Sequence, residues 1–64
     1  MKALVSIITP AYNSAKFIAE TIQSVQNQTY ENWEMLIVDD GSSDATEAIV
    51  QSFLDKDKRI KFYK

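Results

Sequence analysis

The sequence contains no cysteine, no histidine, one glycine and one proline in its 64 residues. Without cysteine it forms no disulfide, which fits a reducing compartment, and without histidine as well it lacks the usual zinc ligands. A chain this short buries only about 60% of the surface that its unfolded form exposes, so its fold is expected to be marginally stable. It must reach that fold without the cross-links on which small domains commonly rely.

Long hydrophobic runs and an excess of positive charge are missing as well. No apolar stretch approaches the ~20 residues of a membrane span, and the N-terminus lacks the hydrophobic region of a signal peptide. The net charge is −2. We expect no nucleic-acid partner, because a surface that binds nucleic acid needs clustered positive charge. With 45% hydrophobic and 25% charged residues, the composition is that of a globular chain.

Three segments are predicted to be strands. Residues 3–9, ALVSIIT, and residues 34–39, EMLIVD, are short and apolar, which is typical of strands buried on both faces of a parallel sheet. Pro10 is predicted to end the first strand, because proline has no N–H to donate to the neighbouring strand. Residues 59–63, RIKFY, alternate enough between polar and apolar side chains to predict a third strand.

Two helices are predicted between these strands. The apolar positions of the first recur at helical spacing and are Ala15, Ile18, Ile22 and Val25, and the predicted buried stripe of the second is Ala45, Ala48, Ile49, Ser52 and Phe53. Asn13 or Ser14 is expected to cap the first helix. Ser43 or Asp44 is expected to cap the second helix, with Glu47 completing a capping box.

Strands that alternate with helices of this length predict an α/β fold, a parallel β-α-β-α-β unit with right-handed crossovers. Both helices should then cover the same face of the sheet, and nothing in the chain covers the other face. Parallel sheets are almost always covered on both faces. We therefore expect residues 1–64 to be a single partial domain, the amino-terminal part of a larger α/β domain. Self-association through the uncovered sheet face is the alternative.

The carboxyl ends of the first two strands are the expected ligand site, as in other open parallel sheets. TPAYN, residues 9–13, and DDGSSD, residues 39–44, meet there. The first turn has no glycine, which argues against a dinucleotide, and the carboxylates of Asp39 and Asp40 would repel a phosphate. A carboxylate instead suits a hydrogen-bond donor such as the imide N–H of uracil or the N1–H and N2–H₂ edge of guanine, with Tyr12 packing on the base.

The motifs VSIITPAYN, SVQNQTY, NWEMLIVDDGSSDAT and RIKFY follow one another over essentially the whole chain. In this order and spacing they resemble the start of the family 2 glycosyltransferases, which have the GT-A fold with a Rossmann-like first half. The resemblance implies transfer of a sugar from a nucleotide-diphosphate donor, usually UDP, to a carbohydrate or lipid-linked acceptor, with inversion at the anomeric carbon. It also implies a role in polysaccharide or cell-surface glycan synthesis. The implied location is the cytoplasm, or the cytoplasmic face of the membrane if other parts of the protein attach there.

The same resemblance implies roles for individual residues. Asp40 matches the carboxylate that binds the base, and Asp39 is its neighbour at the strand end. The residues implied to line the nucleoside pocket are Thr9, Pro10, Ala11 and Tyr12.

The metal-binding D-x-D motif of the family follows a later strand and has no counterpart in this chain. The single D-x-D triplet, residues 55–57, is expected to be a solvated helix terminus. The resemblance implies Mn²⁺ or Mg²⁺ for the full-length enzyme, with metal ligands and a catalytic base outside this chain. We expect no catalytic residue in the segment, and we expect the isolated chain to be inactive.

Other interpretations stay open on the residues alone. A non-catalytic nucleotide-binding or assembly module would use the same strand ends without chemistry. A receiver-like Mg²⁺ pocket also places an aspartate pair after an apolar strand, but after the first strand and with partners on later strands. Asn13 is predicted to be a cap rather than a ligand contact, and Trp33 is predicted to pack against the fold rather than on a sugar.

Overall fold

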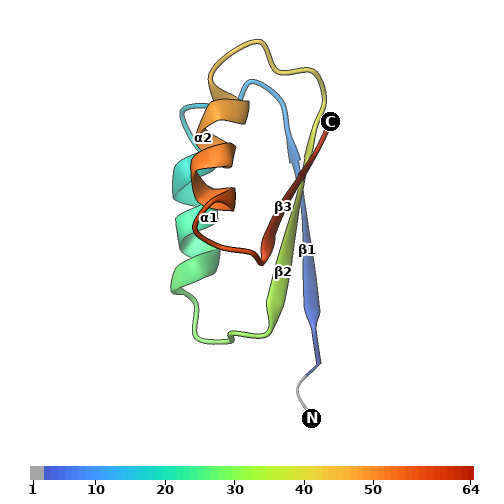
Figure 1. Ribbon diagram of the computed structural model, residues 1–64, viewed down its shortest axis with the longest axis vertical. Coiled ribbons are helices and arrows are strands. Elements are labelled where there is room, and N and C mark those ends of the chain that lie inside the picture. The colour runs from blue at the N-terminus through green and yellow to red at the C-terminus, as the bar shows by residue number, and fades with distance from the viewer. Residues whose placement is uncertain (1–2) are drawn as a thin grey trace.

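A computed structural model describes residues 3–64 of the chain, which form three strands and two helices in the order β-α-β-α-β. Strands β1 (Val5–Ala11), β2 (Trp33–Asp39) and β3 (Ile60–Tyr63) form one parallel sheet in the order β1-β2-β3. Helices α1 (Ile18–Asn27) and α2 (Thr46–Leu54) lie on the same face of that sheet (Figure 1). The predicted fold class and the one-sided placement of the helices are confirmed.

The core lies between the sheet and the two helices. Its buried members are Ala11, Ile18, Ile22, Trp33, Met35, Ile37, Val50 and Ile60. Burying a large aliphatic side chain contributes about 1.5–3 kcal/mol relative to leaving it exposed, so this single layer supplies most of the driving force for folding. No helix among residues 3–64 is long and apolar enough to cross a membrane.

The other face of the sheet is uncovered and carries apolar side chains beside the polar ones of Ser6, Glu34 and Lys61. Successive strand residues point to opposite faces, and Ile7 packs against the core, so its neighbour Ile8 points away from the helices. Ile8 is 68% exposed, and it pairs in register with Leu36 on β2. Val38 and Tyr63, which are in register on β2 and β3, are 41% and 50% exposed. We call this surface the open face.

The prediction that Pro10 ends the first strand is wrong. β1 continues through Pro10, in register with Val38, to Ala11, in register with Asp39. The physical reason is that β1 is an edge strand with a neighbour on one side only. Proline is tolerated on edge strands, where its missing N–H can face the unpaired side.

The predicted helix caps are wrong for both helices. Helix α1 has no side-chain cap from Asn13 or Ser14, and its first turn is closed by the backbone carbonyl of Ser14, which accepts the N–H groups of Phe17 and Ile18. The N-cap residue of α2 is Ala45, which has no side-chain cap, and Asp44, one residue before it, accepts the N–H of Thr46 through Oδ1 at 2.9 Å. The capping box is not completed, because the Glu47 carboxylate pairs with Lys64 Nζ at 2.9 Å instead.

The buried face of α2 differs from the predicted one. Ile49 and Phe53 pack against the core as predicted, whereas Ala45, Ala48 and Ser52 are exposed. The buried positions are Thr46 and Val50, both 0% exposed. The helix is rotated so that the β-branched side chain of Val50 enters the core, because it buries more apolar area there than an alanine would.

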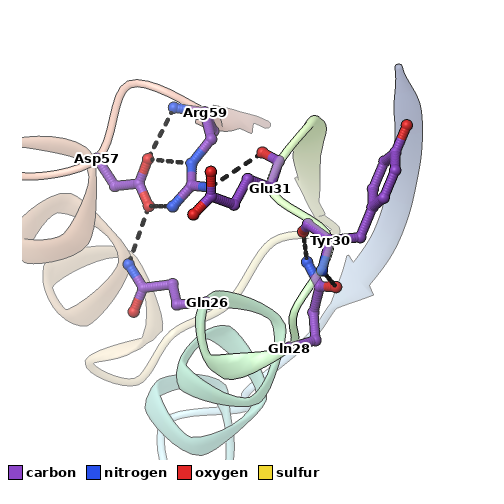
Figure 2. A network of polar contacts seen from close by, with 6 residues as sticks. All are labelled: Gln26, Gln28, Tyr30, Glu31, Asp57 and Arg59. Carbon is purple, nitrogen blue, oxygen red and sulfur yellow. Dashed lines mark hydrogen bonds and ion pairs between the residues drawn. The ribbon is translucent and has the colours of Figure 1, made fainter. Parts of the chain in front are cut away.

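A polar network lies at the other end of the sheet from the carboxyl strand ends (Figure 2). Asp57 Oδ2 accepts hydrogen bonds from Arg59 Nη2 at 2.9 Å and Gln26 Nε2 at 3.1 Å, and Asp57 Oδ1 accepts the Arg59 Nε–H at 3.0 Å. The Arg59 guanidinium lies 3.9 Å from the ring centroid of Trp33, which is 2% exposed. The prediction that Trp33 packs against the fold is therefore confirmed.

The expected solvated terminus at residues 55–57 is wrong for its last member. The Asp57 side chain is only 12% exposed, and the hydrogen bonds from Arg59, with a smaller contribution from Gln26, lower its pKa from 3.8 to about 2. Arg59 is only two residues away in the chain, whereas the Gln26 contact, from α1 31 residues earlier, could not be read from a local pattern.

Candidate functional site

Two loops meet at the carboxyl ends of β1 and β2. The first connects β1 to α1 and the second connects β2 to α2, and both lie at the same end of the sheet in Figure 1. The backbone N–H of Asp40 donates to the carbonyl of Ala11 at 2.9 Å, which extends the pairing one step beyond β2. Tyr12 and Asp40 are therefore the first residues past two paired strand ends.

Asp39 is buried, and both oxygens of its carboxylate accept hydrogen bonds. It is 7% exposed, its Oδ2 accepts the N–H of Ser42 at 3.0 Å, and its Oδ1 accepts the Ser42 hydroxyl. These hydrogen bonds, the hydroxyl first, hold the pKa of the Asp39 carboxyl below its usual range. Gly41, within the same turn, has a φ of 83°, which glycine adopts without a steric penalty. Asp39 thus closes the turn after β2.

Asp40 is in the opposite situation. It is exposed, and within residues 3–64 its carboxylate has neither a hydrogen-bond partner nor an ion-pair partner. A free carboxylate at this edge can accept hydrogen bonds from a ligand without first breaking bonds within the protein. Tyr12, the first residue after β1, is 62% exposed.

The remaining predicted pocket residues lie along the end of β1. Pro10 is exposed, Thr9 is half-buried, and Ala11 is 3% exposed. Because strand side chains alternate, Thr9 and Ala11 face the helices and Pro10 faces the open side. A ligand could therefore reach Ala11 only through its backbone. The binding roles of these three residues stay predictions.

The sequence analysis missed a set of hydrogen bonds between the two loops. The Asn13 N–H donates to Ser42 Oγ at 2.9 Å, and Asn13 Oδ1 accepts the N–H of Ser43 at 2.8 Å. Two further bonds join the start of α1 to the start of α2. They run from Ala15 N–H to Asp44 Oδ2 at 3.1 Å and from Ser14 N–H to Thr46 Oγ1 at 2.8 Å.

We call these four bonds the loop clamp. Each residue in it has a local interpretation as a turn or cap residue, which is why the sequence alone did not reveal it. The available signal was the presence of polar, turn-forming residues after both of two neighbouring strands.

The described residues do not fit a divalent metal. No group of three or more His, Cys, Asp or Glu among residues 3–64 is arranged to hold one. The oxygens of Asp39 are taken up by Ser42, and those of Asp44 accept hydrogen bonds from Thr46 and Ala15. We therefore derive no step through a metal bound to these residues.

These features define a class of protein first. A parallel β-α-β-α-β sheet with polar loops at its carboxyl end is a Rossmann-like α/β unit, and ligands of such units bind at that end. Comparison with known families gives the second step, because the model of the family described as "Glycosyl transferase family 2" matches residues 6–64. The chain belongs to glycosyltransferase family 2, as its motifs predict.

Named relatives agree with this family. TuaG of Bacillus subtilis (strain 168), named for teichuronic acid biosynthesis, is 49% identical over 59 residues, which cover 92% of this chain and 23% of TuaG. WfgD of Escherichia coli is named as a UDP-Glc:α-D-GlcNAc-diphosphoundecaprenol β-1,3-glucosyltransferase. It is 53% identical over 58 residues, 91% of this chain and 22% of WfgD. The chain thus spans about a quarter of the length of these curated relatives.

Proposed function

We propose that this chain forms the part of a family 2 glycosyltransferase that binds the nucleoside of a nucleotide-diphosphate sugar donor, with a UDP-sugar as that donor. The observation that carries the proposal is the free, exposed carboxylate of Asp40 and the exposed residue Tyr12, each one residue past the end of one of two paired strands. The name of WfgD, which includes UDP-Glc as donor and a lipid diphosphate as acceptor, supports the choice of UDP.

The chemistry of uracil fits these two side chains. The imide N–H of uracil can donate a hydrogen bond to the Asp40 carboxylate, and such a bond to a charged group contributes about 1.5–3 kcal/mol. Packing of the Tyr12 ring on the base adds about 0.5–1.5 kcal/mol beyond burial. Cytosine has an acceptor at the same ring position, so its lone pair would face the carboxylate.

The proposed reaction is inverting transfer of a hexose from this donor to a carbohydrate or lipid-linked acceptor in polysaccharide or cell-surface glycan synthesis. The 64 residues supply the nucleoside half of the donor site. Groups that bind the diphosphate, any divalent metal and the catalytic base would come from parts of the protein beyond this chain. We therefore expect no sugar transfer by the isolated chain.

Binding of UDP and CDP, measured by calorimetry on the 64-residue chain, tests the proposal. We expect CDP to bind far more weakly than UDP. Asp40→Asn should weaken UDP binding by about 1.5–3 kcal/mol, because the neutral amide loses the charged hydrogen bond and can present its NH₂ to another donor. Asp55→Asn removes the same charge from an exposed position at the end of α2 and should leave UDP binding unchanged.

Equal affinities of the unmutated chain for UDP and CDP would contradict base recognition by Asp40. Equal losses in Asp40→Asn and Asp55→Asn would mean that the effect comes from net charge rather than from a contact with the base.

A further inference from the structure

A chain of hydrogen bonds leads from a buried carboxylate to the loop that carries Tyr12. The Ser42 hydroxyl donates a hydrogen bond to Asp39 Oδ1, and Ser42 Oγ also accepts a hydrogen bond from the backbone N–H of Asn13 at 2.9 Å. A hydroxyl has one donor and two acceptor positions, so it can make both bonds at once. The Asp39 carboxylate thereby sets the direction in which the Ser42 oxygen can accept.

Asn13 is held on its side chain as well as on its backbone. Its φ is 47°, in the left-handed region that asparagine enters more readily than most residues. This conformation accompanies a second bond, in which Asn13 Oδ1 accepts the N–H of Ser43 at 2.8 Å. Asn13 is thus tied to two consecutive residues of the loop after β2.

Tyr12 therefore lies between two residues that are both attached to the loop of Asp40. On one side, Ala11 is paired in register with Asp39, and its carbonyl accepts the N–H of Asp40 at 2.9 Å. On the other side is Asn13, bound to Ser42 and Ser43. The place of Tyr12 relative to Asp40 is consequently determined by contacts on both sides of it.

We propose that Asn13 and Ser42 are positioning residues that hold Tyr12 beside Asp40, and that Asp39 acts on the nucleoside site only through them. The inference rests on the proposed nucleoside site. It assigns the two neighbouring aspartates different functions, with Asp40 contacting the base and Asp39 setting the geometry. The hydrogen bonds from Ser42, the hydroxyl first, hold the pKa of the Asp39 carboxyl below its usual range, as expected for bonds that favour the ionised form.

The first test needs no ligand. In the ¹⁵N-labelled chain, Ser42→Ala should raise the hydrogen-exchange rate of the Asn13 amide about three- to tenfold, since that amide loses its acceptor. The Tyr12 ring resonances should shift, whereas the exchange of the buried Met35 amide should stay the same. Ser52→Ala is the matched control, because it also removes one hydroxyl hydrogen bond, from Ser52 Oγ to the Ile49 carbonyl, on the outer side of α2.

The second test is a double-mutant cycle on UDP affinity with Ser42→Ala and Tyr12→Ala. Alone, Ser42→Ala should weaken UDP binding about three- to tenfold and leave the ratio of UDP to CDP affinity unchanged, because Asp40 is intact. In the Tyr12→Ala background, the same substitution should have no further effect. Ser42→Thr keeps the hydroxyl and should restore binding close to that of the unmutated chain.

The two proposals fail differently. Unchanged Asn13 exchange and unchanged Tyr12 resonances in Ser42→Ala would overturn the positioning role even if UDP binds. Equal weakening of UDP binding by Ser42→Ala with and without Tyr12 would overturn it as well. If the unmutated chain binds no UDP, the proposed function is wrong, and the ligand-free spectra alone then decide whether Asp39, Ser42 and Asn13 place Tyr12.

Discussion

Three aspartates of this chain show how surroundings give one residue type different roles. Asp39 is buried and accepts two hydrogen bonds from Ser42, and Asp57 accepts hydrogen bonds from Arg59 and Gln26. Asp40 is exposed and has no partner among the described residues. A carboxylate whose oxygens are satisfied within the protein stabilises the fold, whereas a free one at a ligand-binding edge can recognise a ligand.

The Asp57 network predicts a pH dependence of stability. Its folded pKa is about 2, below the ordinary 3.8, so folding favours the ionised form. The stabilisation is complete above pH 3.8 and is lost as the pH falls towards 2. Because the Arg59 side chain is 39% exposed and partly screened by solvent, we expect a contribution of about 1–2 kcal/mol to the free energy of unfolding.

Urea denaturation between pH 2 and pH 6 measures this contribution. In Asp57→Asn, the loss in the free energy of unfolding between pH 6 and pH 2 should be smaller by about 1–2 kcal/mol. Asp55→Asn, at an exposed position two residues earlier, should leave the profile as it is. The lowered pKa values of Asp39 and Asp44 act in the same direction, so part of the fall should persist in Asp57→Asn. A profile unchanged by Asp57→Asn would contradict the assignment.

At the scale of elements, the loop that leads into α1 is attached to the start of α2. The hydroxyl of Thr46, which is 0% exposed, accepts the N–H of Ser14 at 2.8 Å and donates to Asp44 Oδ1 at 2.5 Å. Ser14 lies in the loop between β1 and α1, so this hydroxyl attaches that loop to the first residue of α2. The two loops at the carboxyl end of the sheet are thereby joined through Thr46.

Thr46→Val should destabilise the chain by about 1–3 kcal/mol, because the side chain keeps its shape but leaves the Ser14 N–H without its acceptor. Thr21→Val on α1 is the matched control, since the Thr21 hydroxyl makes no hydrogen bond in the part of the chain that the structure describes. Thermal and urea denaturation of both variants provide the comparison. Equal stability of the two variants would mean that Thr46 contributes through packing alone.

At the scale of the whole molecule, the sheet is covered on one side only. On the open face Ile8 of β1 is in register with Leu36 of β2, and Val38 of β2 is in register with Tyr63 of β3. Parallel sheets are almost always covered on both faces, so we propose that the isolated chain covers its open face with a second copy. Apolar area removed from water contributes about 25 cal/mol per Å², which favours this association.

Sedimentation velocity at several concentrations should show reversible self-association of the 64-residue chain. Ile8→Lys should shift the distribution to monomer, because the charge would have to be buried in the contact. Gln23→Lys adds the same charge on the exposed side of α1 and should leave the association unchanged. A stable monomer at all concentrations in the unmutated chain would contradict self-association.

The sequence by itself determined the order of the elements, the parallel sheet and the meeting of two polar loops at the carboxyl ends of its strands. These follow from local patterns, namely short β-branched segments, apolar residues at helical spacing, and polar residues directly after two strands. The motifs also placed the chain in its family, which the match over residues 6–64 confirms. Information of this kind lies within windows of about 10–20 residues and needs no knowledge of distant contacts.

Tertiary structure decided which polar side chains have hydrogen-bond partners within the protein and which apolar side chains are buried. Asp39 and Asp40 are adjacent and chemically identical, but Ser42 donates its hydrogen bonds to Asp39. The Asp40 carboxylate has no partner among the described residues. Asn13 fits the pattern of a helix cap, but it binds Ser43, 30 residues away. Val50 is buried where the predicted alanines of α2 are exposed. β1 continues through Pro10 because that strand is at the edge of the sheet. Each of these outcomes depends on a partner supplied by chain folding, and local propensity carries no information about such partners.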